Sequence, residues 1–94
     1  MTQDVIAELC SVIENRKQAP REGSYTCALL EAGPQKILKK VGEEAAEVVV
    51  AGAIESDERL VYETADLIYH LLVMLASKGL AWDDVLAELA RRFG

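Results

Sequence analysis

The chain has 94 residues, of which 51% are apolar, and carries a formal net charge of −6 at pH 7. This length fits a single domain, residues 1–94, with a core of modest size. The negative charge argues against nucleic acid or an anionic membrane as a partner, and the longest strongly apolar run, Leu71 to Ala76, is far too short to span a bilayer.

Helical periodicity dominates the sequence, and strand signals are almost absent. The first predicted helix carries apolar residues at three- and four-residue steps and has Arg16 and Lys17 in its last turn. These two cations either compensate the helix dipole or contact phosphate. The apolar positions of this helix are Val5, Ile6, Leu9, Val12 and Ile13.

A loop is predicted over residues 18–23, which contain proline and glycine. A short second helix follows, with a hydroxyl side chain at its N-cap and Gly33 at its end. Ser24 and Thr26 either cap this helix or contact a phosphate or ribose of a ligand.

The third helix is predicted from about Pro34 to Ile54, with a broad apolar face bordered by an acidic stripe. Glu44 and Glu47 belong to this stripe, and because they are three residues apart they face the same way. The stripe lies against the core instead of facing open water, which disfavours a merely solvated cluster.

The fourth helix is predicted to start at Ser56 or Asp57 and to continue to Lys78. Glu63 and Asp66 repeat the three-residue acidic spacing on it. From Leu67 to Ala76 this helix is apolar nearly all round, which is typical of a helix enclosed on every side. One short chain has few helices to enclose it, so we expect a homodimer or a higher homo-oligomer.

A last short helix has Asp83 and Asp84 in its first turn and Arg91 and Arg92 in its last, matching the helix dipole. The predicted fold is therefore an all-α bundle of four to five helices, built on an antiparallel helix hairpin and completed by dimerisation. Cys10 and Cys27 are isolated and are expected to be reduced structural thiols. The acidic N-terminus is unlike a secretory signal, so we expect a cytoplasmic protein.

An antiparallel hairpin brings the two acidic pairs to one place. Like charges at helical spacing repel by roughly 0.2–0.5 kcal/mol per pair, so a fold gains nothing from the arrangement unless a cation lies among the carboxylates. Oxygen ligands with no His or Cys nearby favour Mg²⁺ or Mn²⁺ over zinc. The sequence therefore predicts a metal site formed by Glu44, Glu47, Glu63 and Asp66.

His70 follows Asp66 by one helical turn and could extend this metal site. Its neighbours Leu67, Leu71 and Met74 favour instead a hydrogen-bonded histidine in the core or at an interface. Tyr69 and Trp82 are interpreted as packing residues, although an aromatic ring could stack on adenine.

The pattern E-x-x-E, a spacer, then E-x-x-D resembles the signature of the all-α, MazG-like nucleoside triphosphate pyrophosphohydrolases. Within that superfamily the chain closely resembles the phosphoribosyl-ATP pyrophosphohydrolase family over nearly its whole length. One small departure is Ala81, where the family more often has a capping hydroxyl. The residues that carry the resemblance are Ser24-Tyr25-Thr26, Gly33, Lys36-Ile37, the run from Lys39 to Val48, and the run from Glu63 to His70.

The resemblance implies Mg²⁺-dependent hydrolysis of a nucleotide substrate, phosphoribosyl-ATP, to phosphoribosyl-AMP and pyrophosphate in histidine biosynthesis. Glu44 and Glu47 would then be catalytic as metal ligands, while Glu43 would either support them or act as the general base. Lys40 lies one turn before Glu44 and is interpreted as a phosphate ligand in preference to a surface ion pair, with Lys36 as a further candidate.

Two other functions stay open. A housekeeping enzyme of the same superfamily would hydrolyse free nucleoside triphosphates and would need no phosphoribosyl site. A non-enzymatic metal-binding bundle is the alternative from a different class. Ferritin-like di-iron bundles usually carry Glu-x-x-His, whereas this chain has Glu-x-x-Asp at the second pair.

Overall fold

The computed structural model describes residues 4–94, which form helices and connecting turns and contain no strand. The predicted all-α fold is therefore confirmed. The helices are α1 (Val5–Gln18), α2 (Tyr25–Ala32), α3 (Pro34–Ile54), α4 (Asp57–Ser77) and α5 (Trp82–Phe93).

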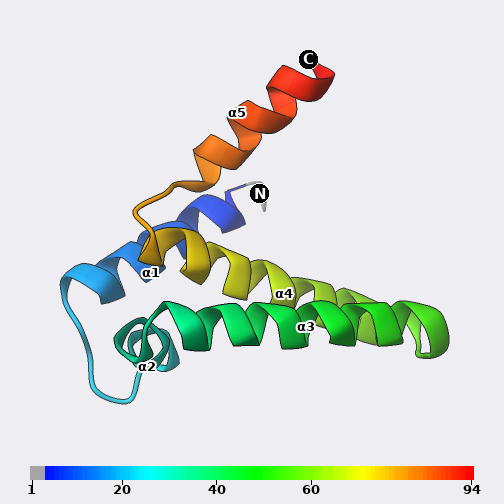
Figure 1. Ribbon diagram of the computed structural model, residues 1–94, viewed down its shortest axis with the longest axis horizontal. Helices are drawn as coiled ribbons and strands as arrows, with labels where there is room; N and C mark the ends of the chain where they lie inside the picture. Colours follow the sequence, from blue (N-terminus) through cyan, green and yellow to red (C-terminus); the bar gives the residue numbers. More distant parts are fainter. Residues whose placement is uncertain (1–3) are drawn as a thin grey trace.

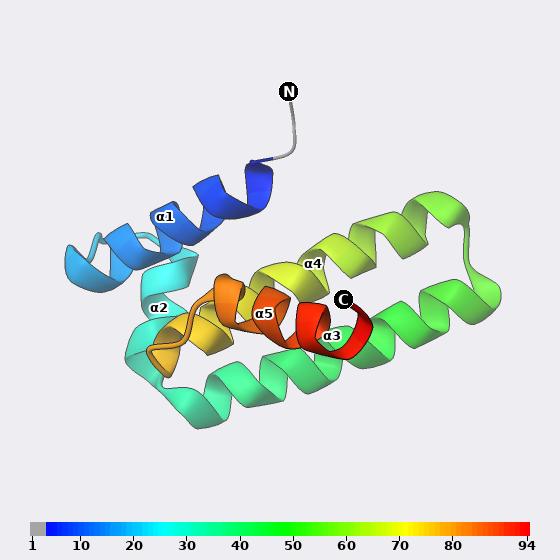
Figure 2. The same ribbon diagram turned by 90° about the horizontal axis from the view of Figure 1, so that it is seen from above.

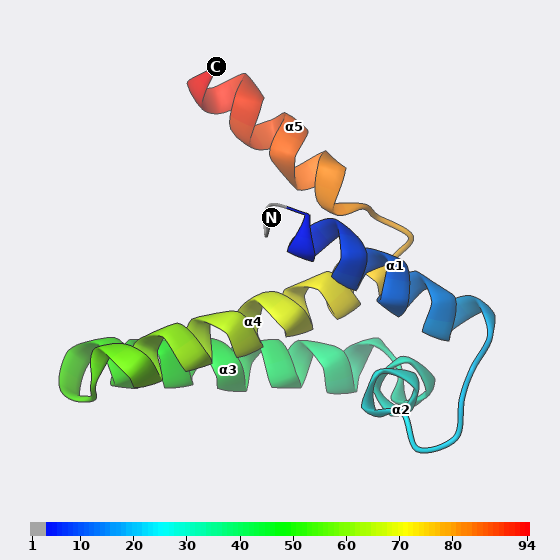
Figure 3. The same cartoon turned by 180° about the vertical axis from the view of Figure 1, so that it is seen from behind.

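Helices α3 and α4 form the long antiparallel hairpin on which the molecule is built (Figure 1, Figure 3). The two helices are equal in length, at 21 residues each, and are joined by a short turn. The Ser56 hydroxyl accepts a hydrogen bond from the backbone N–H of Arg59 at 3.2 Å, which caps the start of α4. This pairing places the acidic stripes of the two helices opposite each other.

Helix α2 lies across the open end of the hairpin (Figure 1). Its N-cap is Ser24, whose hydroxyl accepts from the backbone N–H of Cys27 at 3.1 Å. Gly33 ends the helix with a φ of +95°, a conformation that glycine adopts at no steric cost, and Pro34 then starts α3. The hydroxyl cap and the glycine stop are the features that the sequence predicted.

The core lies where α1 and α2 meet the hairpin, and each of these four helices contributes to it. Helix α1 packs on α2 and α4 (Figure 2). Lys17 at the end of α1 donates a hydrogen bond to the backbone oxygen of Ala76 in the last turn of α4, at 2.9 Å. The core residues are Ile13, Leu29, Ile37, Leu72 and Val73.

Helix α5 extends away from the hairpin and packs little on the other helices (Figure 1, Figure 3). None of its residues is buried, and Phe93 at its end is 82% exposed. Ala81 has no side chain that could cap this helix. Instead the Asp84 carboxylate accepts from the Ala81 N–H at 2.8 Å, and the Ala81 carbonyl accepts from the Asp84 N–H at 3.0 Å.

Among the described helices, α4 alone has the length and hydropathy of a membrane span, with a mean hydropathy of 1.3 over its best 18 residues. Core helices of soluble proteins meet the same criteria, so this is weak evidence. The middle of α4 also carries Glu63, Asp66 and His70, which are costly in a bilayer. The expectation that the protein has no membrane partner stays a prediction.

Candidate active site

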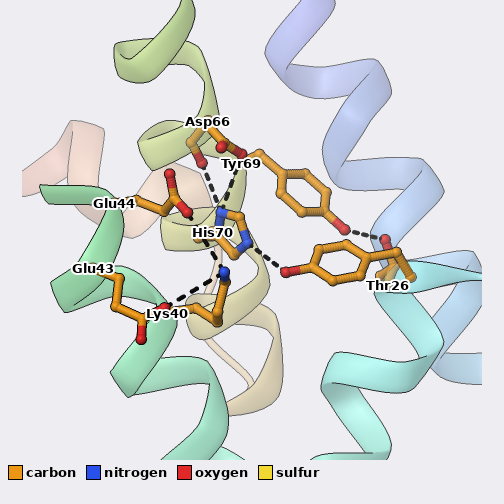
Figure 4. A network of polar contacts seen from close by, with 8 residues as sticks. Thr26, Lys40, Glu43, Glu44, Asp66, Tyr69 and His70 are labelled. Atoms are coloured by element: carbon orange, nitrogen blue, oxygen red, sulfur yellow. Dashed lines mark hydrogen bonds and ion pairs between the residues drawn. The ribbon is translucent and has the colours of Figure 1, made fainter. Parts of the chain in front are cut away.

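The hairpin brings the four predicted acids into two overlapping groups, with two acids from α3 and two from α4. One carboxylate oxygen from each of Glu44, Glu47 and Glu63 lies within 4.8 Å of the others. Glu44 also belongs to a second group of the same kind, with Asp66 and His70 (Figure 4). Glu44 is thus the residue that the two groups share.

Two of these acids are withdrawn from solvent, since Glu44 and Glu63 are each only 5% exposed. The Oε1 atom of each is buried without a hydrogen-bond partner in the described part of the chain. Buried polar atoms in native proteins are almost always satisfied, so each of these oxygens needs a proton, a water or a bound cation as its partner. Oxygens that face a shared space from two helices are the donor set that a divalent cation takes.

Burial and the neighbouring carboxylates raise the pKa of both buried acids. Burial raises the pKa of the Glu44 carboxyl, and its neighbours Asp66 and Glu47 raise it further. Burial likewise raises the pKa of Glu63, again with a contribution from Glu47, while the guanidinium of Arg59 opposes the shift. Without a metal, both carboxyls are therefore harder to ionise than ordinary glutamic acids.

Lys40 lies beside the cluster on α3. Its Nζ atom is 3.5 Å from the Glu43 carboxylate and 3.6 Å from that of Glu44 (Figure 4). The phenol of Tyr25 and these two carboxylates raise the pKa of Lys40, although burial opposes them. Glu43 itself points to the solvent side, with 46% of its side chain exposed. The structure thus places Glu43 and Lys40 at the rim of the acidic cluster.

Arg59 is the second cation at the cluster, and sequence reasoning missed it. Its guanidinium donates to the Glu63 carboxylate and lies 4.6 Å from the centre of the Tyr62 ring. The spacing of four residues between Arg59 and Glu63 was a signal that could have found the pair. Arg59, Glu47 and Glu63 line a cavity of about 330 Å³ on the side away from α2.

Of the four residues predicted to contact substrate, the two hydroxyls lie on or beside α2 and the two lysines lie on α3. Ser24 caps α2, and the Thr26 hydroxyl shares a hydrogen bond with the Tyr69 hydroxyl (Figure 4). Lys36 is exposed one turn before Lys40 and forms no ion pair within residues 4–94. Only Lys40 of this set is therefore held at the acidic cluster.

His70 is buried, at 3% exposure, and both of its ring nitrogens have hydrogen-bond partners. Nδ1 lies 2.8 Å from the backbone oxygen of Asp66, and Nε2 lies 3.0 Å from the Tyr25 hydroxyl. The hydrogen-bonded histidine that the sequence favoured is what the structure contains. Tyr25 at this position was not singled out from the sequence.

The pKa shifts predict how stability depends on pH in the presence of a chelator. Between the ordinary glutamic acid value of 4.5 and the raised values of Glu44 and Glu63, the folded protein binds more protons than the unfolded chain. The free energy of unfolding should therefore fall as pH rises through that window. Glu44→Gln should weaken this dependence and stabilise the metal-free protein at neutral pH.

The measurement is urea unfolding of wild type and Glu44→Gln at a series of pH values. Glu31→Gln, at an exposed acid on α2, is the matched control and should behave as wild type. An identical pH dependence for wild type and Glu44→Gln would contradict the assignment of the shift to this buried carboxyl.

Comparisons with known proteins agree with this geometry. A family model described as phosphoribosyl-ATP pyrophosphohydrolase matches residues 6–93. Phosphoribosyl-ATP pyrophosphatase of Pelotomaculum thermopropionicum is 57% identical over 90 residues, covering 96% of this chain and 92% of that protein. The protein of the same name from Trichlorobacter lovleyi is 55% identical over 92 residues, covering 98% of this chain and 85% of that protein.

A bifunctional relative shows the same likeness in part of its length. The histidine biosynthesis bifunctional protein HisIE of Caldanaerobacter subterraneus subsp. tengcongensis is 50% identical over 90 residues, which is 96% of this chain and 44% of that protein. The family match covers more than nine tenths of the chain and includes all four acids of the cluster. The chain therefore belongs to the phosphoribosyl-ATP pyrophosphohydrolase family.

Proposed function

We propose that this protein hydrolyses phosphoribosyl-ATP to phosphoribosyl-AMP and pyrophosphate, the second step of histidine biosynthesis, with Mg²⁺ bound in the acidic cluster. The relatives' names and the family match support the reaction. The single structural observation that carries the proposal is the pair of buried carboxylate oxygens, on Glu44 and Glu63, that lack partners within the described chain. Such a pair has a clear use in metal-assisted phosphate chemistry and none in a plain helical hairpin.

The residues present fit a divalent cation. The donors are carboxylate oxygens alone, which suits Mg²⁺ and also allows Mn²⁺. Glu44, Glu47, Glu63 and Asp66 would hold the cation, two from each side of the hairpin. When bound, it supplies positive charge that offsets the negative charge developing on the phosphate oxygens.

The chain's own residues then have distinct roles around the cluster. The ammonium group of Lys40 lies at the rim of the acidic cluster, where it would contact a phosphate of the substrate. Glu43 is exposed there and is not needed to hold the cation, so we assign it to accept the proton of the attacking water. Lys36 lies one turn further toward α2 and would reach a more distant phosphate.

The α2 end of the site is where the rest of the substrate would lie. Ser24 and Thr26 stand at the start of α2, on either side of Tyr25, whose hydroxyl contacts His70. Their hydroxyls already serve as a cap and as a partner of Tyr69, so contact with ribose or phosphate would be an additional role. Because the net charge is −6, we expect the protein to bind a small nucleotide through local cations and not to bind nucleic acid. We place the protein in the cytoplasm.

The substrate assignment predicts a preference that a direct assay can measure. Phosphoribosyl-ATP should be hydrolysed with a far higher kcat/KM than ATP or any deoxynucleoside triphosphate, because free triphosphates lack the second phosphoribosyl group. Pyrophosphate release is measured for each substrate with Mg²⁺ and with a chelator. Equal turnover of ATP would indicate a housekeeping nucleoside triphosphate pyrophosphohydrolase, and no turnover of any substrate would indicate a non-enzymatic bundle.

A second prediction separates a functional carboxylate from a structural one. Glu47→Gln keeps the side-chain shape but removes a negative charge and a metal ligand. We expect pyrophosphate release to fall by about 100-fold or more. In chelator the variant should be as stable as wild type or slightly more stable, since repulsion with Glu44 and Glu63 is relieved.

With excess Mg²⁺ the order of stability should reverse. A ligand at a hundred times its Kd stabilises the folded state by about 2.7 kcal/mol, and Glu47→Gln should lose much of this gain. Paired melting curves in chelator and in Mg²⁺ give the comparison, with Glu31→Gln as the control. If Glu47→Gln destabilises the metal-free protein and leaves turnover intact, Glu47 is structural.

We also propose that two or more copies assemble. Within Leu67–Ala76 the chain itself buries only His70, Leu72 and Val73, and the other residues are half-buried. Further apolar side chains on the hairpin and on α5 are exposed. They are Leu38, Val49, Val50, Ile54, Val61, Tyr62, Leu86, Leu89 and Phe93.

Light scattering tests this assembly at micromolar protein concentration. Wild type should have the mass of a dimer or a larger oligomer, and Leu71→Glu should reduce that mass because Leu71 is only half-covered by its own chain. Leu72 is unsuitable for this test, since it is 3% exposed in the core of the single chain. A stable wild-type monomer would contradict the assembly.

A further inference from the structure

The imidazole of His70 is held in one orientation by hydrogen bonds at both ends of the ring. A backbone carbonyl only accepts, so Nδ1 must carry the proton that it shares with the Asp66 oxygen at 2.8 Å. In the neutral ring, Nε2 is then an acceptor, and the Tyr25 hydroxyl donates to it at 3.0 Å. These contacts fix the Nδ1–H tautomer.

This tautomer leaves no lone pair of His70 open to a metal ion. Nδ1 is protonated, and the lone pair of Nε2 faces the Tyr25 hydroxyl. His70 is nevertheless within reach of the acids, because the same Nδ1 lies 3.4 Å from Oδ1 of the Asp66 side chain (Figure 4). The ring thus contacts both the backbone oxygen and the carboxylate of Asp66 through its protonated Nδ1, and it offers Glu44 and Asp66 no free nitrogen as a third ligand.

Tyr25 connects this support to α2. It stands at the first position of α2, its ring meets the His70 ring edge-on at 5.8 Å, and it is itself 51% exposed. A chain of contacts thus runs from the start of α2, through the buried imidazole, to a carboxylate on α4.

We propose that His70 and Tyr25 are positioning residues that hold the Asp66 carboxylate in the orientation needed to bind the divalent cation. The inference rests on the proposed function for its cation and adds to it a role for two side chains outside the acidic cluster. Groups that orient a metal ligand in this way typically change metal affinity about 10–100-fold when they are removed.

The alternative is a purely structural contact between α2 and α4. The molecule contains its own control for this alternative, since Tyr69 shares a hydrogen bond with Thr26 across the same two helices. The rings of Tyr25 and Tyr69 are stacked, with their centres 6.1 Å apart. Tyr25→Phe and Tyr69→Phe therefore each remove one hydroxyl from the same contact, but only the first removes a partner of His70.

The first measurement is Mn²⁺ affinity, obtained from the electron paramagnetic resonance signal of free Mn²⁺ in titrations of the full chain. Tyr25→Phe should weaken Mn²⁺ binding by about tenfold, and Tyr69→Phe should bind as wild type. His70→Leu should weaken binding by up to about 100-fold. His70→Asn should recover part of that loss, because its amide N–H can still donate to the Asp66 carbonyl.

The second measurement is the nitrogen NMR spectrum of the imidazole, for which the chain is well suited because His70 is its one histidine. An untagged protein at a pH of about 8, above the ordinary imidazole pKa of about 6.5, should show the Nδ1–H tautomer. Addition of Mg²⁺ should leave this tautomer and the Nε2 signal in place, since neither nitrogen binds the ion.

Several results would overturn the inference. They are equal Mn²⁺ affinities for Tyr25→Phe and Tyr69→Phe, an Nε2–H tautomer in wild type, or a large Mg²⁺-induced shift of Nε2. If His70→Leu fails to fold, the tyrosine pair still decides the question. Pyrophosphate release by wild type is assayed in parallel, because its absence would contradict the proposed function, whereas unequal tyrosine variants would still support the positioning role.

Discussion

The candidate site is built around two buried carboxylates that face each other across the α3–α4 hairpin. Glu44 and Glu63 are nearly excluded from water, and each has one oxygen without a partner within the described residues. Such groups cost free energy unless a cation or a proton neutralises them, and the raised pKa of each carboxyl is the signature of that cost. The hairpin therefore holds together an acidic cluster that is unfavourable on its own, and the divalent cation that we propose there would neutralise it.

The rest of the fold can be understood as support for that site. The apolar core at the junction of α1, α2 and the hairpin fixes the two long helices in register. Lys40 and Arg59 each pair with one of the buried acids and offset part of its charge. His70 contacts the Asp66 backbone oxygen on α4 and the Tyr25 hydroxyl at the start of α2, and so connects these two helices. The neighbouring residues thus hold the two buried carboxylates in positions that are unfavourable without a neutralising partner.

Much of the fold was predictable because the local signals are strong. The helix-period pattern, the Ser24 cap and the glycine stop at Gly33 each act within one or two turns of the chain, and the structure contains all three. The approach of the two acidic pairs was also predictable, because each pair has a three-residue spacing and the two helices form a hairpin. The hydrogen-bond partner of His70 was not predictable, because Tyr25 is far away in sequence. The Arg59–Glu63 pair was overlooked, although its four-residue spacing is visible in the sequence. Helix α5 buries none of its residues in the single chain, so the sequence pattern that predicted the helix could not predict what its apolar side chains contact.

Anomalous diffraction from crystals soaked in Mn²⁺ would test the claim that the acidic cluster is a divalent-cation site. We expect an anomalous peak among the carboxylates of Glu44, Glu47, Glu63 and Asp66, with no bond to His70. Glu47→Gln crystals soaked in the same way should lose most of that peak. A Mn²⁺ peak elsewhere on the protein, with none between α3 and α4, would contradict the claim.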